Sequence, residues 1–77
     1  MTKLGASPSR KVLKALAVNG VSHQRPAKGS HVLATDPENP RRRTNVPHGE
    51  VRVGTLRRIV AQIGDDREHF AEKLSRM

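Results

Sequence analysis

Apolar residues recur at helical spacing near the start of the chain. A Ser-Pro pair predicts where this helix begins, with Ser7 as the N-cap and Pro8 at the first helical position. An Asn-Gly pair at residues 19–20 predicts its end, because glycine tolerates the left-handed conformation that follows a helix. The apolar face of this helix is predicted to consist of Val12, Leu13, Leu16 and Ala17.

The same spacing returns in the last third of the chain. Apolar residues at i, i+3, i+4 and i+7 predict a second amphipathic helix, which Thr55 caps and Gly64 ends. A short final helix is predicted to follow, with a capping box that begins at Asp65 and an apolar i, i+4 pair formed by Phe70 and Leu74. The apolar stripe of the second helix consists of Leu56, Ile59, Val60 and Ile63.

The segment between the two longer helices has the character of β-structure. Apolar and β-branched residues between turn signals predict three strands, over residues 21–25, 30–35 and 41–46. The loops between them are short, which favours antiparallel pairing. We therefore predict an α+β chain of order α-β-β-β-α: a three-stranded antiparallel sheet, two helices on one of its faces, and a short C-terminal helix. This is the arrangement of a double-stranded-RNA-binding-type fold.

The length and composition limit the organisation of the chain. Its 77 residues suffice for one small domain, which we place at residues 9–77 after a flexible N-terminus at residues 1–8. The lack of cysteine excludes disulfides and thiolate metal sites. No apolar run approaches the ~18 residues of a membrane span. We expect a cytoplasmic protein without a membrane partner.

The charge indicates a polyanionic partner. Lys and Arg number 15 and Asp and Glu number 7, which gives a formal charge of +8. Such a field attracts nucleic acid, and the planar guanidinium of arginine suits phosphate oxygens. An acidic protein partner stays open, whereas the basic residues are too dispersed for a helix that lies on a membrane surface. The three consecutive arginines at 41–43 predict an edge strand, or at least a strand with a solvated face.

Four histidines are the candidates for chemistry, and one has a distinctive context. Their spacing matches no metal-binding motif, so we expect no metal site. The core of so short a chain is small, so we expect no cavity for a small-molecule cofactor either. His31 follows Gly29 and Ser30 at a predicted strand start, and a glycine there lets a backbone approach a phosphate closely. From periodicity alone, an ordinary exposed strand residue is the more common interpretation of His31. The four are His23, His31, His48 and His69.

Acid–base chemistry on RNA is the sharper interpretation of His31. RNA carries its own nucleophile, the 2′-hydroxyl, so a base that removes its proton starts attack on the adjacent phosphate. Imidazole titrates near neutral pH and suits this role, while cationic side chains stabilise the charge on phosphorus. His48 is our candidate for a helper. The residues predicted to contact RNA are Arg25, Lys28, Ser30, Arg41, Arg42, Arg43, His48 and Arg57.

Three sequence strings occur in an order typical of one family. Residues 28–31, Lys-Gly-Ser-His, resemble its "GSH" strand start, and residues 43–48, Arg-Thr-Asn-Val-Pro-His, resemble its "TVPxH" segment. Residues 53–64 resemble its helix that begins Gly-Thr-Leu-Arg. The family is that of the HicA-type toxins, mRNA interferases of bacterial toxin–antitoxin pairs. With the first helix, the resemblance covers roughly residues 12–70.

The resemblance implies a fold, an activity and a partner. The fold is the α-β-β-β-α arrangement, and the activity is ribosome-independent cleavage of mRNA, which arrests translation. His31 falls on the active-site histidine of the family, and a HicB-type antitoxin covers that residue. The chain departs from the family pattern at Val21, Val32 and Leu33, where aromatic or histidine side chains are common. These departures affect RNA contacts and hairpin packing and leave His31 in place.

Two other functions are compatible with parts of the sequence. A non-catalytic RNA-binding domain of the same fold would bind RNA with steep salt dependence and leave it intact. A DNA-binding repressor is disfavoured, because the second helix lacks the short turn and paired helix of a helix-turn-helix motif. The sequence leaves a homodimer open.

Overall fold

The computed structural model describes residues 3–77; Met1 and Thr2, at the start of the predicted flexible segment, lie outside the described residues. The last two residues of that segment form a short strand, which pairs with a second short strand through Ser7↔Val51 and Pro8↔Glu50. The elements are β1 (Ser7–Pro8), α1 (Ser9–Val18), β2 (His23–Pro26), β3 (His31–Asp36), β4 (Asn39–Pro47), β5 (Glu50–Val51), α2 (Val53–Gln62) and α3 (Arg67–Ser75).

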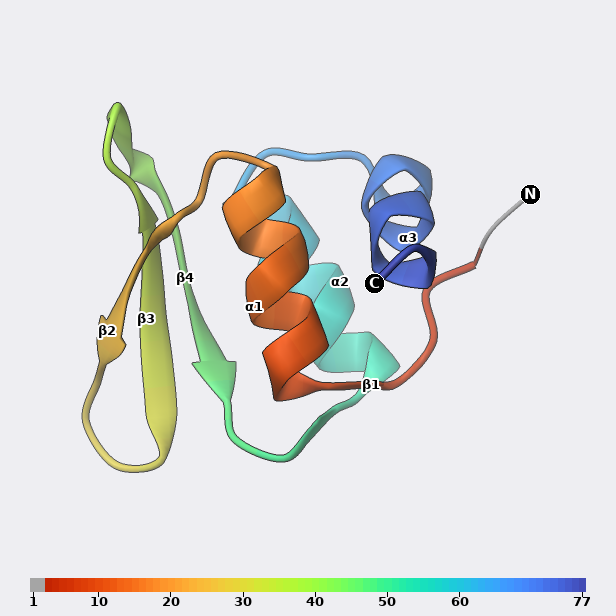
Figure 1. Cartoon of the computed structure of the whole chain (residues 1–77), viewed down its shortest axis with the longest axis horizontal. Helices are drawn as coiled ribbons and strands as arrows, with labels where there is room; N and C mark the ends of the chain where they lie inside the picture. Colours follow the sequence, from red (N-terminus) through yellow and green to blue (C-terminus); the bar gives the residue numbers. More distant parts are fainter. Residues whose placement is uncertain (1–2) are drawn as a thin grey trace.

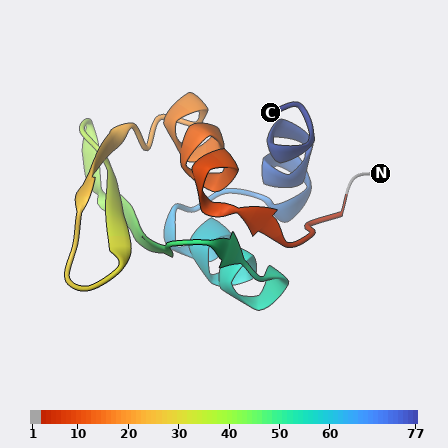
Figure 2. The ribbon, with the colours of Figure 1, turned by 60° about the horizontal axis from the view of Figure 1, so that its bottom comes forward.

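The elements form layers. β2, β3 and β4 make an antiparallel sheet in that order, and α1 and α2 cover one of its faces. α3 packs on the far side of the two longer helices, while the other face of the sheet is bare (Figures 1 and 2). The predicted α+β fold is therefore confirmed, with two helices on one face of a three-stranded sheet. The pairing of β1 with β5 was not predicted.

Alternation along the strands assigns each sheet residue to one face. On β3, Ala34 and Asp36 are buried against the helices, whereas His31 is exposed. On β4, Thr44 and Val46 are buried in the same way. Because successive side chains in a strand point to opposite faces, even-numbered residues of β3 and β4 face the helices and odd-numbered ones face the bare side. This alternation determines which sheet residues lie on the same face as His31.

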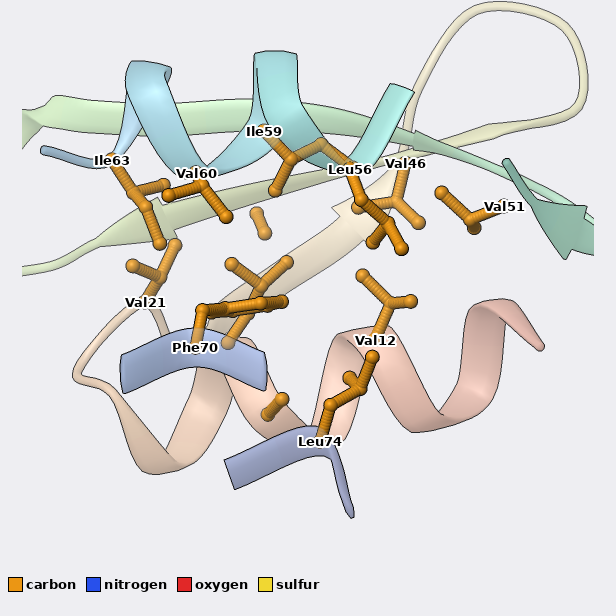
Figure 3. Close-up of a cluster of buried hydrophobic side chains, with 13 residues drawn as sticks. Val12, Val21, Val46, Val51, Leu56, Ile59, Val60, Ile63, Phe70 and Leu74 are labelled. Atoms are coloured by element: carbon orange, nitrogen blue, oxygen red, sulfur yellow. The ribbon is translucent and has the colours of Figure 1, made fainter. Parts of the chain in front are cut away.

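The core lies between the sheet and the two longer helices, and it continues between these helices and α3. Figure 3 shows side chains from α1, α2, α3, β4 and β5 meeting there, with Phe70 fully buried. The predicted stripe of α2 and the pair Phe70 and Leu74 are confirmed as core. On α1 the prediction was wrong for Ala17, which is exposed, while Ala15 is buried. The buried face of α1 follows the i, i+3, i+4 positions that start at Val12, and Ala17 falls outside it.

The predicted helix ends were right and the helix starts were not. Gly20 and Gly64 both have positive φ, +92° and +68°, directly after their helices. Pro8, rather than Ser7, is the N-cap of α1, because both residues pair in β1 before the helix begins. The structure places the N-cap of α2 at Arg52 rather than Thr55, and its first turn closes through Leu56 N donating to Arg52 O at 2.9 Å.

The cap of the last helix is shifted by one residue from its predicted place. Asp66, not Asp65, is the N-cap of α3, and its Oδ2 accepts a hydrogen bond from His69 N at 3.1 Å. The carboxylate of Asp65 instead accepts from Asn19 Nδ2 at 2.9 Å, at the end of α1. A tertiary contact therefore decides between two adjacent aspartates.

One arginine connects the sheet to the C-terminal ends of both longer helices. Arg42 Nη1, in β4, donates a hydrogen bond to Asp36 Oδ2, in β3, at 2.6 Å. Its Nε donates to Ile63 O at 2.8 Å and its Nη2 donates to Asn19 O at 3.1 Å. Asn19 and Ile63 are the C-cap residues of α1 and α2, where carbonyls lack intrahelical partners and the helix dipole is negative. The guanidinium of Arg42 therefore holds the two helix ends against the sheet.

We expect the stability of the protein to fall in acid through Asp36. The Glu38 backbone N–H, which donates to Asp36 at 2.9 Å, lowers the pKa of this carboxyl below its ordinary 3.8; burial opposes this effect, and Arg42 adds to it. A carboxyl with a lowered folded pKa contributes stability above its unfolded pKa and loses it as the pH falls through its folded pKa.

As the pH drops below about 4, the melting temperature of the wild type should therefore decrease more steeply than that of Asp36→Asn, which has no carboxylate to protonate at this position. At neutral pH the variant should be the less stable protein, and the two should converge in acid. Parallel melting temperatures over the acid range would contradict this role of Asp36. Thermal unfolding followed by circular dichroism measures both curves.

Candidate functional site

His31 is the first residue of the central strand, at one end of the sheet. It is exposed, and its parity places it on the bare face, opposite Pro47 in the register of β3 with β4. The backbone around it is well fixed, because Ala27 N donates to His31 O at 2.9 Å. An exposed imidazole on a fixed strand end can reach a bound polymer without a change in the fold.

Two glycine-containing turns lie beside His31. Gly29, in the turn from β2 to β3, has φ +74°, and Gly49, in the turn from β4 to β5, has φ +84°. A Cβ added at either position would meet no atom within 4 Å, so there is open space at both turns. The predicted contact residues Lys28 and Ser30 are exposed in the first of these turns. The strand end thus offers room for a ligand backbone next to His31.

The bare face of the sheet is cationic. Register and parity place Arg25 of β2 beside Leu33 of β3, and Thr35 beside Arg43 of β4. Within residues 3–77, none of the sheet positions that face this side holds a carboxylate. Asp36 faces the helices, and Glu38 lies in the turn between β3 and β4. A polyanion on this face therefore meets attraction without local repulsion.

The arginine triplet divides between the two faces of the sheet. Arg41 and Arg43 are exposed, whereas Arg42 is half-buried and holds the helix ends as described above. The triplet is therefore not one solvated patch. The guanidinium of Arg42 donates hydrogen bonds to Asp36 and two backbone carbonyls. The candidate site therefore includes Arg41 and Arg43 but not Arg42.

The structure separates Arg57 from the sheet face. This residue is exposed on α2, in the helical layer. Its neighbour Arg58 lies closer to the sheet, since Arg58 Nη2 donates to Asn45 O at 2.9 Å on the outer edge of β4. This contact closes part of that edge, which sequence spacing could not indicate because residues 45 and 58 belong to different elements.

The four histidines have three different environments. His31 and His48 lie at the same end of the sheet, since His48 N donates to Ser30 O at 3.0 Å. His69 is on α3, where its Nδ1 lies 2.9 Å from Asp65 Oδ1. His23 pairs with Thr35, so it shares the bare face with His31 but lies about 13 Å away along the strands. Strand alternation is the sequence signal that places His23 and Asn45 on this face, although neither was predicted to contact RNA.

A pocket of about 250 Å³ lies between the N-terminal segment and α3, lined by residues that include Ser7, Lys11 and Leu74, and His31 is not among them. No group of three or more His, Asp or Glu side chains within residues 3–77 is arranged to hold a metal ion. Among the helices described, none has the length and apolar character to cross a membrane.

Comparison with protein families identifies the chain. The family model described as the HicA toxin of bacterial toxin–antitoxin systems matches residues 9–64, which is more than half of the chain. The chain belongs to the HicA toxin family. The matched region runs from the start of α1 to the end of α2 and includes the whole sheet with His31. The comparison with curated proteins finds no match to the chain.

Membership in the HicA family confirms the resemblance seen in the sequence strings. A HicA toxin is one member of a toxin–antitoxin pair, so the family implies a cognate antitoxin. HicA toxins are generally of the ribonuclease type. The α3 helix follows the matched region and packs on α1 and α2 through Phe70, Ala71 and Leu74, so it extends the core and stays away from the bare face.

Proposed function

We propose that this protein is a metal-independent endoribonuclease that cleaves mRNA and thereby arrests translation. The observation that carries the proposal is the exposed imidazole of His31 at the end of a sheet face that bears arginines and no carboxylates. In this proposal His31 transfers a proton during attack of the RNA 2′-hydroxyl on the adjacent phosphate. Lys28 and Arg25 stabilise the negative charge that develops on phosphorus.

The bare face of the sheet is proposed to hold the RNA strand. Arg43, Arg41 and Arg25 supply phosphate contacts, and Ser30 supplies a hydroxyl next to His31. The one aromatic residue, Phe70, is fully buried in the core. Bases therefore have no Phe, Tyr or Trp side chain on which to stack, and such stacking is a common means of recognising unpaired bases. Contacts to phosphate dominate, and we expect weak base selectivity.

The antitoxin is proposed to be a HicB-type protein that covers His31. An acidic surface would complement the bare face, and burial of the exposed imidazole would exclude RNA from the site. The family membership implies the antitoxin, and the exposure of His31 at a strand end makes it accessible to such a partner. The pair is proposed to act in the cytoplasm, where mRNA is found.

Incubation of the purified protein with end-labelled RNA, in the presence and absence of EDTA, tests the proposal. We expect fragments that end in 2′,3′-cyclic phosphate, at the same rate in both conditions. RNA that is bound but remains intact would instead support a non-catalytic RNA-binding domain of the same fold. That outcome would be consistent with RNA binding on the bare face and would exclude ribonuclease activity.

The position of the RNA can be tested with two variants of equal charge. Arg41→Ala/Arg43→Ala changes the bare face, and Arg10→Ala/Lys14→Ala changes the exposed side of α1; each lowers the formal charge by two. Loss of two phosphate contacts should weaken RNA binding at least tenfold and reduce the slope of log affinity against log salt by about 2. We expect this for the sheet variant and a much smaller effect for the α1 variant. The opposite order in a titration by fluorescence anisotropy would place the RNA along α1.

A further inference from the structure

We propose that RNA lies along the central strand β3 and that the protein contacts nucleotides on only one side of the bond that it cleaves. The inference rests on the proposed ribonuclease function and adds the path of the substrate to it. Its basis is the arrangement of side chains on the bare face. Three of these side chains, which were not predicted to contact RNA, are Leu33, Thr35 and Asn45.

The pairing of the three strands arranges the side chains of the bare face in rows, with one residue from each strand. The row next to His31 consists of Arg25, Leu33 and Asn45, and the row after it consists of His23, Thr35 and Arg43. Neighbouring rows are two residues apart on each strand, or about 7 Å, which is also close to the separation of neighbouring phosphates in an extended nucleotide strand. An RNA strand parallel to β3 therefore places successive nucleotides over successive rows, with the scissile phosphate at His31.

The two outer strands carry the positive charges of these rows, and the central strand carries none. On the bare face, β3 contributes Leu33 and Thr35, which are half-buried. Arg25 on β2 and Arg43 on β4 are exposed on either side of it. The phosphates of a strand that follows β3 are therefore attracted from both sides along its length. A strand that crossed the sheet would meet the cations of one row only.

Asn45 and Leu33 give the row next to His31 groups that can contact a base. Asn45 is exposed, and its backbone is held because its carbonyl oxygen accepts a hydrogen bond from Arg58 Nη2 at 2.9 Å. An amide side chain can hydrogen-bond to the edge of a base, and an apolar side chain can pack against its face. The base preference of the protein, which we expect to be weak, should therefore arise from the nucleotide over this row.

The sheet extends from His31 in one direction only. His31 is the first residue of β3, and its partner Pro47 is the last residue of β4. Past this pair lies the turn from β2 to β3 with Lys28, which in the proposed function contacts the scissile phosphate itself. In the other direction the bare face continues through both rows to Arg41 and the turn with Glu38, whose carboxylate repels phosphate. The protein therefore contacts about two or three nucleotides on one side of the cleaved bond.

Shortening an RNA from either end tests this one-sided contact. A short RNA is centred on a bond that the wild-type protein cleaves in long RNA, and nucleotides are removed one at a time from its 5′ end or its 3′ end. Removal of the second and third nucleotides on one side should lower kcat/KM for that bond at least about tenfold, because two phosphate contacts are lost. The same removal on the other side should change kcat/KM by no more than about twofold, since no contact is lost. The sensitive side gives the polarity of the RNA on β3.

Two arginine variants test whether the sensitive nucleotides lie over the row that contains Arg43. Arg43→Ala should lower kcat/KM for the untrimmed RNA by about 3–10-fold, and should have no effect on the RNA that lacks the second and third nucleotides of the sensitive side. Arg10→Ala is the matched control, because it also removes one exposed positive charge but lies on α1, and it should affect both RNAs equally. Both arginines are exposed, so the variants should fold like the wild type.

The outcomes separate this inference from the proposed function. Equal losses from both ends of the RNA, or no loss from either end, would overturn the one-sided path and leave the ribonuclease proposal standing. An effect of Arg43→Ala that is the same on the untrimmed and the trimmed RNA would also overturn it. If the wild type cleaves no long RNA, the proposed function fails and the inference fails with it.

Discussion

Replacing His31 with alanine is expected to lower RNA cleavage by about 10²–10⁴-fold, which is the usual contribution of a positioned acid or base. The imidazole is exposed at a strand end, so its loss removes proton transfer without opening a cavity in the core. The backbone hydrogen bond from Ala27 N to the carbonyl oxygen of residue 31 is retained in the alanine variant, because it does not involve the side chain. We therefore expect the variant to fold normally and to bind RNA with affinity close to that of the wild type.

Induced expression in a bacterium gives the same prediction a second readout. Wild-type protein should arrest growth, and His31→Ala should permit it at an equal protein level. His69→Ala is the control, because His69 is an exposed histidine on α3, away from the bare face, and this variant should remain toxic. Growth arrest by His31→Ala as strong as that of the wild type would show that His31 is not the catalytic group.

Replacing Arg42 with alanine is expected to destabilise the fold by about 2 kcal/mol or more. The loss of the hydrogen bonds to Asn19 O and Ile63 O alone accounts for this figure, at about 0.5–1.5 kcal/mol each. At 4–8 °C for each kcal/mol in a domain of this size, the melting temperature should fall by roughly 10 °C. Both helix ends then lose the cation that faces their unpaired carbonyls.

Arg41 is the internal control for this prediction. It is the adjacent arginine, exposed and on the opposite side of β4, so Arg41→Ala should change stability by no more than about 0.5 kcal/mol. Arg42→Lys should be intermediate, because an ammonium keeps the charge but lacks the fork that reaches Asp36 and two carbonyls together. Equal melting temperatures for Arg42→Ala and Arg41→Ala would contradict the proposed role of Arg42 in holding the helix ends against the sheet. Urea denaturation gives the free energies of unfolding directly.

The sequence by itself determined the order and type of the main elements and most of the core. Helical spacing in 56–63 and the positive-φ glycines at 20 and 64 carry this information locally, because an apolar stripe and a left-handed stop depend on neighbours in sequence. The position of His31 at a strand start was equally readable, since turn residues precede it. The resemblance to HicA toxins lay in three short strings, and the family comparison confirms it.

The tertiary structure alone decided which side chains share a surface. Three successive arginines look equivalent in sequence, yet Arg42 is committed to the helix ends while its neighbours remain exposed. The proximity of His48 to Ser30 arises from strand register, which depends on pairing between distant residues. The same long-range pairing made Pro8 rather than Ser7 the N-cap of α1. Local patterns specify elements, whereas the partners of a charged side chain depend on how those elements pack.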